Sequence, residues 1–233
     1  MNIAITGASR GIGKAIAVAF AARGHHLYLS ARNEKLLDQT KDELALQFPS
    51  SHVKAKAFDL SNGENAKELG YWIKADCPGL DILVNNAGSY LPGYVHNEQE
   101  GVLEEMIQTN LYSAYHLTRV LVPQMMEQKR GHIFNICSIA SLQAYPNGGA
   151  YSISKFALAG FNKNLREEMK SYGIKVTGIY PGAVLTDSWE GFDNSSHRIM
   201  ETEDIAKMVY ASSQLSIAAC VEDIIIRPLA GDL

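Results

Sequence analysis

The sequence predicts an α/β fold: a doubly wound, parallel sheet of seven strands with helices on both faces. Short apolar runs rich in β-branched residues alternate with longer segments of helical periodicity from one end of the chain to the other. Strand, helix, strand units joined by right-handed crossovers build such a sheet. No low-complexity linker, Pro-rich joint or change in composition marks a boundary within the 233 residues, so we expect one domain over residues 1–233.

The strands and helices follow from the apolar pattern in chain order. In the first helical segment, Ile12 and Ile16 lie on one stripe, and Gly24 follows as a typical helix end. Two long helices are predicted over residues 98–128 and 149–172. The first begins in the acidic run NEQEGVLEE, which suits the positive end of a helix dipole. The predicted strands cover residues 3–6, 26–31, 53–58, 82–85, 132–137, 175–180 and 221–227.

One segment does not fit this pattern. Residues 183–200, AVLTDSWEGFDNSSHRIM, have no sustained period and carry Trp189 and Phe192 among polar residues. A long loop in a compact protein is either disordered or a lid over a functional site, and we expect residues 183–200 to form a lid.

Composition excludes several classes of function. The chain has 21 Lys and Arg against 25 Asp and Glu, a formal charge of −4, and no basic block that could follow a nucleic-acid backbone. Cys77, Cys137 and Cys220 lie far apart, without a Cys-x-x-Cys pair or a His cluster, so we expect small buried side chains and no metal. There is no signal-peptide pattern and no apolar run of about 18 residues, so a soluble, cytoplasmic protein is expected.

Three glycines follow the first predicted strand. Gly7, Gly11 and Gly13 lie in TGASRGIG, between that strand and the helical stripe that begins at Ile12. Without Cβ atoms the backbone can approach a pyrophosphate, and the helix N-terminus supplies N–H donors and a positive dipole. Three glycines often form only a turn, but after the first strand of an α/β protein they predict a nucleotide site.

The end of the second strand indicates which nucleotide binds. NAD-binding folds usually offer Asp or Glu there to the adenosine ribose, whereas this chain has Ser30, Ala31 and Arg32. Arg10, within the glycine turn, can converge with Arg32 on the same corner. Two guanidinium groups suit a 2′-phosphate, so we predict NADP(H) in preference to NAD(H).

Two further strand ends carry polar residues. Asp59 follows the third strand with Leu60 beside it, where its carboxylate could accept from an adenine amino group; capping of the next helix is an equal alternative. Asn86, Ala87 and Gly88 follow the fourth strand at the carboxyl edge, where open α/β sheets bind their ligands.

A serine, a tyrosine and a lysine complete the predicted site. Ser138 ends the fifth strand, and Tyr151 and Lys155 lie four positions apart in AYSISKFA, about one turn apart on one helix face. Alone, such a pair commonly decorates a solvated surface. Beside a nucleotide site, the hydroxyl, phenol and amine indicate proton transfer.

With these residues in place, the chain resembles a short-chain dehydrogenase/reductase of the single-domain type. The resemblance is carried by TGASRGIG, NNAG, Asn110 in MIQTNLYSAY, Ser138, YSISK and YPGAVLT, in family order over essentially the full length. It implies a Rossmann fold and hydride transfer between a nicotinamide and a carbonyl carbon, with a secondary alcohol in the reverse direction.

The resemblance also implies a role for each polar group. Tyr151 would be the general acid in reduction and the base in oxidation. A free phenol titrates near ~10, so the Lys155 ammonium, with oxidised nicotinamide, is expected to lower the pKa of Tyr151 and Lys155 to hold the nicotinamide ribose. Ser138 would donate to the substrate oxygen. Asn110 would bind a water that links Lys155 to solvent; from the residues alone, a mid-helix Asn facing water is the alternative.

The predicted cofactor site combines the strand-end turns with the helix pair, and the resemblance adds the Pro-Gly turn and its neighbours. It consists of Gly7, Ser9, Arg10, Gly11, Ile12, Gly13, Arg32, Asp59, Leu60, Asn86, Ala87, Gly88, Tyr151, Lys155, Pro181, Gly182, Val184 and Thr186.

The family fixes the chemistry but not the substrate. We expect a pocket formed by Ser89 and Tyr90 after the fourth strand, Ala140 and Tyr145 after the fifth, and Trp189 in the lid. This mixture of apolar and aromatic side chains, without a cationic group, predicts a small ketone or aldehyde as the substrate.

Two other functions stay open. TGASRGIG is also common among 3-oxoacyl-carrier-protein reductases, although the ending VEDIIIRPLAGDL is more similar to sepiapterin-reductase and carbonyl-reductase members. A non-catalytic NADP(H)-sensing protein would use the same fold, but it need not keep the serine, tyrosine, lysine and asparagine together.

Self-association is also expected. Tyr115 and Leu158 are among the apolar positions that lie outside a single stripe on the two long helices. With the resemblance, they predict a homodimer or homotetramer formed through residues 98–128 and 149–172.

Overall fold

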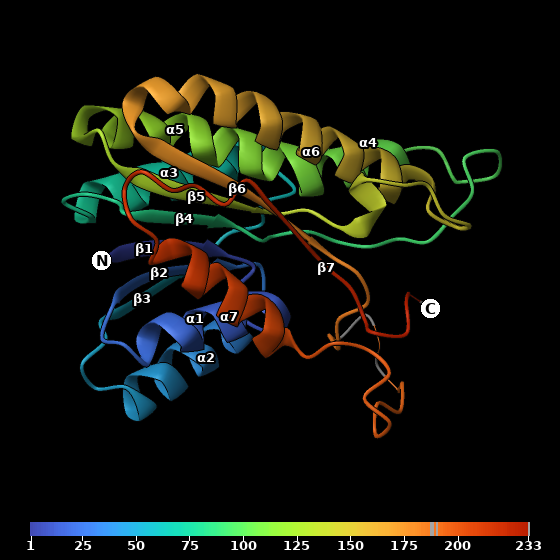
Figure 1. Ribbon diagram of the computed structural model, residues 1–233, viewed down its shortest axis with the longest axis horizontal. Coiled ribbons are helices and arrows are strands. Elements are labelled where there is room, and N and C mark those ends of the chain that lie inside the picture. Colours follow the sequence, from blue (N-terminus) through green and yellow to red (C-terminus); the bar gives the residue numbers. More distant parts are fainter. Residues whose placement is uncertain (187–188, 190, 233) are drawn as a thin grey trace.

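The computed structural model describes residues 1–186, 189 and 191–232, and these form one seven-stranded sheet (Figure 1). All neighbouring strands pair in parallel, in the order β3-β2-β1-β4-β5-β6-β7. The predicted parallel, doubly wound sheet is therefore confirmed. The strands are β1 (Asn2–Thr6), β2 (His26–Ala31), β3 (Val53–Ala57), β4 (Ile82–Asn85), β5 (Gly131–Ile136), β6 (Ile174–Pro181) and β7 (Asp223–Ile226).

The helices differ from the prediction mainly in the two long segments. The helix expected over residues 98–128 begins only at Val102 and contains a π-helical turn, and the helix expected over 149–172 ends in a 3₁₀ turn. The elements are α1 (Gly11–Ala21), α2 (Glu34–Gln47), α3 (Gly63–Asp76), α4 (Val102–Ile107), the π-helix η1 (Gln108–Tyr112), α5 (Ser113–Gln128), η2 (Ile139–Ser141), α6 (Gly149–Met169), η3 (Lys170–Tyr172) and α7 (Thr202–Ser213).

The helices cover the sheet in two layers, with α3, α5 and α6 on one face and α1, α2 and α7 on the other (Figure 1). Alternation along β1 serves both layers, because Ile3 and Ile5 pack in the core beside α1 and Ala4 packs in the core beside α3 and α5. The strand order reverses between β1 and β4. In open α/β sheets this point of reversal opens a crevice at the carboxyl edge.

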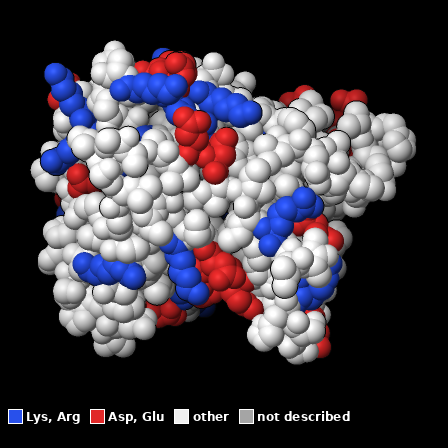
Figure 2. Space-filling view, viewed as in Figure 1, with Lys and Arg blue, Asp and Glu red and all other residues white. Residues whose placement is uncertain are grey.

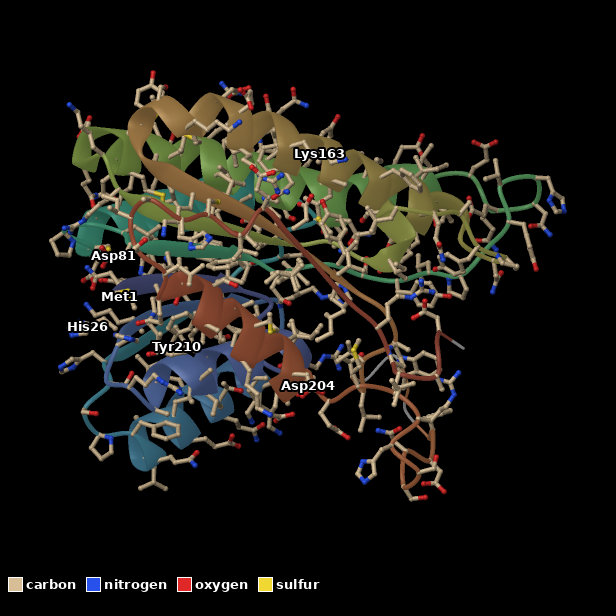
Figure 3. All side chains as sticks on the ribbon, in the orientation of Figure 1. Met1, His26, Asp81, Lys163, Asp204 and Tyr210 are labelled. Carbon is tan, nitrogen blue, oxygen red and sulfur yellow. The ribbon has the colours of Figure 1, made fainter. Side chains whose placement is uncertain are left out.

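The amino edge of the sheet lies at the opposite end of the molecule. Met1, His26 and Asp81 lie there (Figure 3), and the carboxylate of Asp81 accepts a 2.8 Å hydrogen bond from the backbone N–H of Asn2. This bond fixes the start of β1 beside β4.

Among the described residues, no helix combines the length and the apolar composition that crossing a membrane requires.

The outer faces of α5 and α6 leave apolar side chains at the surface. Tyr115 is 37% exposed and Phe156 45% exposed, and Ile153 lies on the same face of α6 as Phe156. Leu158, which the sequence assigned to this outer surface, is instead buried against Tyr180 because it points towards β6. On the face shown in Figure 2, basic and acidic side chains are intermixed, and the projecting end is mainly uncharged.

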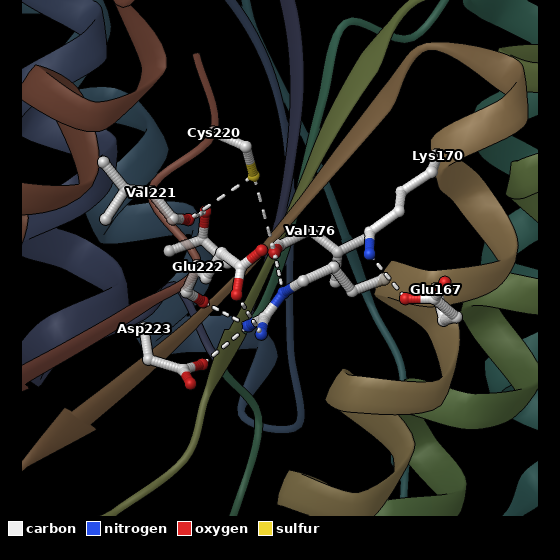
Figure 4. Close-up of polar contacts among 9 residues, drawn as sticks. Glu167, Lys170, Val176, Cys220, Val221, Glu222 and Asp223 are labelled. Carbon is white, nitrogen blue, oxygen red and sulfur yellow. Dashed lines mark hydrogen bonds and ion pairs between the residues drawn. The ribbon is translucent and has the colours of Figure 1, made fainter.

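A buried arginine ties the last strand to the fold. Arg166 of α6 donates from Nε to the carbonyl oxygen of Val176 at 2.9 Å and forms a 2.6 Å ion pair with Asp223. Asp223 opens β7, so this pair joins α6, β6 and β7 (Figure 4). Nearby, Cys220 is exposed and its Sγ lies 3.9 Å from the same Val176 oxygen. The expectation of a buried Cys220 is therefore wrong, because the segment before β7 crosses the surface.

A buried histidine in β5 has only one neutral tautomer open to it. The hydroxyl of Thr177 donates to the carbonyl oxygen of Val221 at 2.6 Å, so its contact with His132 Nε2 at 2.7 Å must be donated by the ring. Nδ1 then carries no hydrogen, and it has no partner among the described residues. Burial, aided by the charge of Lys175, lowers the pKa of His132 to about 3.

This histidine should make the protein sensitive to acid. Below pH 6.5 the unfolded chain takes up a proton that folded His132 excludes, so the free energy of unfolding should fall by up to about 1.4 kcal/mol per pH unit towards pH 3. In His132→Leu, the free energy of unfolding should lack this fall towards acid pH. Urea unfolding of both proteins between pH 7.5 and 4.5 measures the difference in slope. Equal slopes would contradict the assignment.

Candidate functional site

The turn between β1 and α1 requires glycine at three positions. Gly7 has a φ of +64° and Gly11 a φ of +54°, in a region that residues with a Cβ rarely adopt. At Gly13 the constraint is space, because a Cβ would lie 2.3 Å from the carbonyl oxygen of Gly7. The side chain of Thr186 borders this turn, with its methyl carbon 3.4 Å from the Cβ position of Gly11.

The first turn of α1 favours an anion from outside the chain. It contains no acidic residue, and Arg10 at the N-cap position carries only donors. The residues of the first turn and Arg10 therefore supply no carboxylate to the N–H groups of this turn, where the helix dipole is positive. On the side of α2, the hydroxyl of Thr40 donates to the carbonyl oxygen of Ser9 at 3.0 Å and holds the turn in place.

A reciprocal set of hydrogen bonds joins the turns after β1 and β4. The hydroxyl oxygen of Thr6 accepts from the backbone N–H groups of Asn86 and Ala87, at 3.0 and 2.9 Å. The Asn86 amide donates to the carbonyl oxygens of Thr6 and Gly7, at 2.9 and 3.1 Å. Asn86, predicted to contact the cofactor, thus uses its amide to hold the glycine turn, and Thr6 is a residue that the sequence reasoning missed.

The corner beyond β2 and β3 carries exposed charges. Arg10, Arg32 and Asp59 are all exposed. Asp59 accepts from the hydroxyl and the backbone N–H of Ser61, at 2.8 and 3.1 Å, and these bonds, with the charge of Arg32, lower the pKa of its carboxyl. The side chain of Asn62, and not that of Asp59, caps α3. The capping alternative for Asp59 is therefore wrong.

Four of the predicted cofactor residues have buried side chains: Leu60, Lys155, Pro181 and Val184. Leu60 and Val184 are each 5% exposed and pack in the two cores, so only their backbone could face a ligand. Pro181 ends β6. After it, a Cβ at Gly182 would lie 2.1 Å from a carboxylate oxygen of Asp232, so the Pro-Gly turn backs directly onto the C-terminal segment.

The segment 183–200 is closed at its base. Val184 pairs with Met200, and backbone hydrogen bonds run between Leu185 and Met200 and between Met200 and Ala183. Within the segment, Trp189 packs edge to face on Phe192, with ring centres 5.3 Å apart. Residues 187, 188 and 190 of the predicted lid lie outside the described residues.

The serine, tyrosine and lysine do come together. Ser138 is the N-cap of η2, and its hydroxyl oxygen accepts from the N–H of Ala140 at 3.1 Å. This leaves its hydrogen for Tyr151, the third residue of α6. Lys155 is 6% exposed, and its Nζ donates to the carbonyl oxygen of Ile136 at 3.0 Å and lies 5.9 Å from the ring centre of Tyr151. It also lies close to the Gly88 backbone.

The pKa of Tyr151 moves in the direction opposite to the one expected. Burial raises it, and the hydrogen bond from Ser138 offsets only part of that rise. Burial also lowers the pKa of Lys155 to about 8. For the chain by itself, the net shift of the Tyr151 pKa is therefore upward, and the Lys155 ammonium is directed at the Ile136 carbonyl. That Lys155 and oxidised nicotinamide together lower the pKa of Tyr151 stays a prediction.

Asn110 is buried and fully engaged, so the alternative of a solvated side chain is wrong. It is 1% exposed and lies in the π-helical turn η1. Its Oδ1 accepts from Ser89 N–H at 2.8 Å, and its Nδ2 donates to the Ser89 carbonyl oxygen at 3.0 Å and to the Ser154 hydroxyl at 2.9 Å. Ser154 in turn donates to the carbonyl oxygen of Tyr151 at 2.7 Å. That Asn110 binds a water stays a prediction.

Three tyrosines meet at the predicted substrate pocket. Tyr90 packs edge to face on Tyr151 with ring centres 4.9 Å apart, and Tyr145 lies close enough to both for their charges to act on it. Burial raises the pKa of Tyr145. Ser89 is half-buried beside them. Ala140, in contrast, is 1% exposed, so its methyl group does not face this space.

The chain is similar to known proteins over most of its length. The family model for short chain dehydrogenases matches residues 1–196. An oxidoreductase from Staphylococcus aureus strain MW2, itself named as uncharacterised, is 32% identical over 226 residues, which is 97% of this chain and 96% of the relative. Sepiapterin reductase from Chlorobaculum tepidum is 33% identical over 237 residues, covering 98% and 96%.

A solved structure agrees in fold over nearly the same length. A metagenomic short-chain oxidoreductase in complex with NADP has a TM-score of 0.85 and 29% identity to this chain, with 98% and 96% of the two chains covered. The family model covers most of the chain, and the two relatives named above match this chain over almost its whole length. The chain therefore belongs to the short-chain dehydrogenase family of oxidoreductases.

Proposed function

We propose that this protein is an NADP(H)-dependent oxidoreductase that reduces small ketones or aldehydes and, in reverse, oxidises secondary alcohols. The observation that carries the proposal is the convergence of Ser138, Tyr151 and Lys155 at the carboxyl edge of the sheet. They adjoin the β1 and β4 turns, because Lys155 Nζ lies 3.6 Å from the Cβ position of Gly88.

The residues present suit a dinucleotide with a 2′-phosphate. The first turn of α1 has no acidic residue and carries the positive end of the helix dipole, so it fits a pyrophosphate. The exposed guanidinium groups of Arg10 and Arg32 fit a further phosphate, and the metagenomic relative was solved with NADP. When bound, the nicotinamide would exchange a hydride with the substrate carbon.

The chain's own groups would manage the proton and the developing charge. Because burial raises its pKa, Tyr151 is protonated at neutral pH and can give its proton to the substrate oxygen in reduction. Ser138 would turn its hydroxyl hydrogen from Tyr151 to the same oxygen. Lys155 is mainly cationic below its pKa of about 8 and would hold the ribose hydroxyls. In oxidation, Tyr151 would act as the base.

The substrate would lie against Ser89, Tyr90 and Tyr145, with residues 183–200 and Trp189 as its cover. The half-exposed aromatic surface favours a small, partly apolar carbonyl compound, and one relative is a sepiapterin reductase. We further propose that residues 1–233 act as one domain and that copies of the chain associate as a homodimer or homotetramer through α5 and α6, whose outer faces expose Tyr115, Ile153 and Phe156.

Removing the phenolic hydroxyl tests the mechanism. Tyr151→Phe should lower kcat for carbonyl reduction by about 10²- to 10⁴-fold, because it removes the proton donor, and should change the dissociation constant for NADPH by no more than about 2-fold. Turnover is measured by NADPH absorbance over a panel of ketones, aldehydes and acyl thioesters. Tyr115→Phe makes the same chemical change on the outer face of α5 and should leave kcat unaltered.

Two results would count against this mechanism. Near-native turnover in Tyr151→Phe would remove Tyr151 from the proton transfer. A wild-type protein that binds NADPH tightly but reduces no member of the panel would favour a non-catalytic NADP(H) sensor.

Reversing one charge tests the cofactor preference. Arg32→Asp should lower the ratio of kcat/KM for NADPH to that for NADH by roughly 10- to 150-fold, because a charge-assisted hydrogen bond of about 1.5–3 kcal/mol is lost. Lys74→Asp makes the same change in net charge at the far end of α3 and should leave the ratio unchanged. An unaltered ratio in Arg32→Asp would refute the role of Arg32.

A further inference from the structure

The helix that carries Tyr151 is capped by a residue from another segment. Its N-cap residue, Gly148, has no side chain, so the first N–H groups of α6 need an acceptor from elsewhere. Glu98 supplies it, because its Oε1 accepts a 2.8 Å hydrogen bond from the backbone N–H of Ala150. Ala150 directly precedes Tyr151. A carboxylate at this end of a helix is also favoured by the helix dipole.

Two glycines form the socket for this carboxylate. A Cβ at Gly149 would lie 1.9 Å from Glu98 Oε1, and a Cβ at Gly93 would lie 2.7 Å from it. Gly149 also has a φ of +37°, a conformation that L-residues rarely adopt. Any other residue at either position would displace the Glu98 side chain. The two glycines, one in the loop after β4 and one at the start of α6, therefore make room for its carboxylate.

The same contacts fix one wall of the substrate pocket. In the loop after β4, the N–H of Gly93 donates to the carbonyl oxygen of Asn147 at 3.1 Å, just before α6, and the N–H of Glu98 donates to the carbonyl oxygen of Tyr94 at 3.0 Å. Earlier in this loop, Tyr90 packs on the Tyr151 ring. Glu98 thus joins the pocket wall to the first turn of α6.

Glu98 does not serve the helix that follows it. The acidic run was expected to favour the N-terminus of its own helix, and Glu104 and Glu105 do lie in the first turn of α4. Glu98, however, precedes Gly101, the N-cap of α4, and its carboxylate is directed at α6. It is half-buried, whereas Glu100 in the same run is exposed.

We propose that Glu98 is a positioning residue of the reductase, which acts through the Ala150 N–H to hold the Tyr151 phenol where proton transfer requires it. The proposal rests on the proposed function of Tyr151. A displacement of about 1 Å at a reacting group can cost roughly 10²-fold in rate. The Glu98 oxygen positions the phenol because it accepts the hydrogen bond from the Ala150 N–H, and not because of its negative charge alone.

Three variants test this proposal: Glu98→Ala, Glu98→Gln and, as a matched control, Glu100→Ala. Glu98→Ala should lower kcat by about 10- to 100-fold while KM for NADPH stays within about 2-fold, because the cofactor residues of the glycine turn are untouched. Glu98→Gln keeps an acceptor oxygen and should retain kcat within about 3-fold of wild type. Glu100→Ala should match wild type.

Amide exchange provides a readout that is independent of turnover. By NMR, the Ala150 N–H should exchange at least about 10-fold faster in Glu98→Ala than in wild type, and at a near-native rate in Glu98→Gln. If Glu98→Ala does not fold, Glu98→Gln decides, because near-native kcat and exchange support the proposal and a loss of either overturns it.

The outcomes separate the two proposals. Native kcat in Glu98→Ala, or equal losses in Glu98→Ala and Glu98→Gln, would refute the positioning role of Glu98. Unchanged Ala150 exchange in Glu98→Ala would refute the cap itself. Absence of any carbonyl turnover in wild type would refute the proposed function, and the exchange measurement would still report on the cap.

Discussion

The hydrogen bonds between Thr6 and Asn86 are the constraint on which the rest of the site depends. They join the ends of β1 and β4, the two strands between which the order of the sheet reverses. With Asn86 Nδ2 only 2.8 Å from the Cβ position of Gly7 and 2.6 Å from that of Gly13, no side chain fits at either glycine. The close approach of the two turns thus dictates both the glycines and the shape of the crevice.

A second set of buried polar side chains positions α6, the helix that carries Tyr151, relative to the sheet. Asn85 donates to Asn135 at 2.9 Å, and Asn135 donates to Asn162 of α6 at 2.8 Å. The first bond joins β4 to β5, where residues 85 and 135 are in register, and the second joins β5 to α6. All three side chains are at most 4% exposed. Because a buried amide without partners is costly, such a network permits few alternative placements of α6.

The sequence was sufficient for the fold and for the residues of the glycine turn, because strand periodicity and strand-end turns are local patterns. Ser138, Tyr151 and Lys155 could be assigned together since parallel strands end at one edge. The direction of the Tyr151 pKa could not be predicted, because it depends on burial and on where the Lys155 ammonium points. Glu98 could not be connected to α6 either, since 52 residues separate the partners of that bond.

The loop after β4 is anchored at a few points through backbone atoms. Asn110 holds only backbone atoms of Ser89, and the Gly93 contact with Asn147 is also between backbone atoms. Exchange of the side chains at positions 90–92 and 94–97 leaves these anchors intact. The surface proposed to face the substrate can therefore diverge, by mutation or by design, without loss of the framework that holds Tyr151, the proposed proton donor. Within one scaffold, substrate range and chemistry are encoded by separate sets of residues.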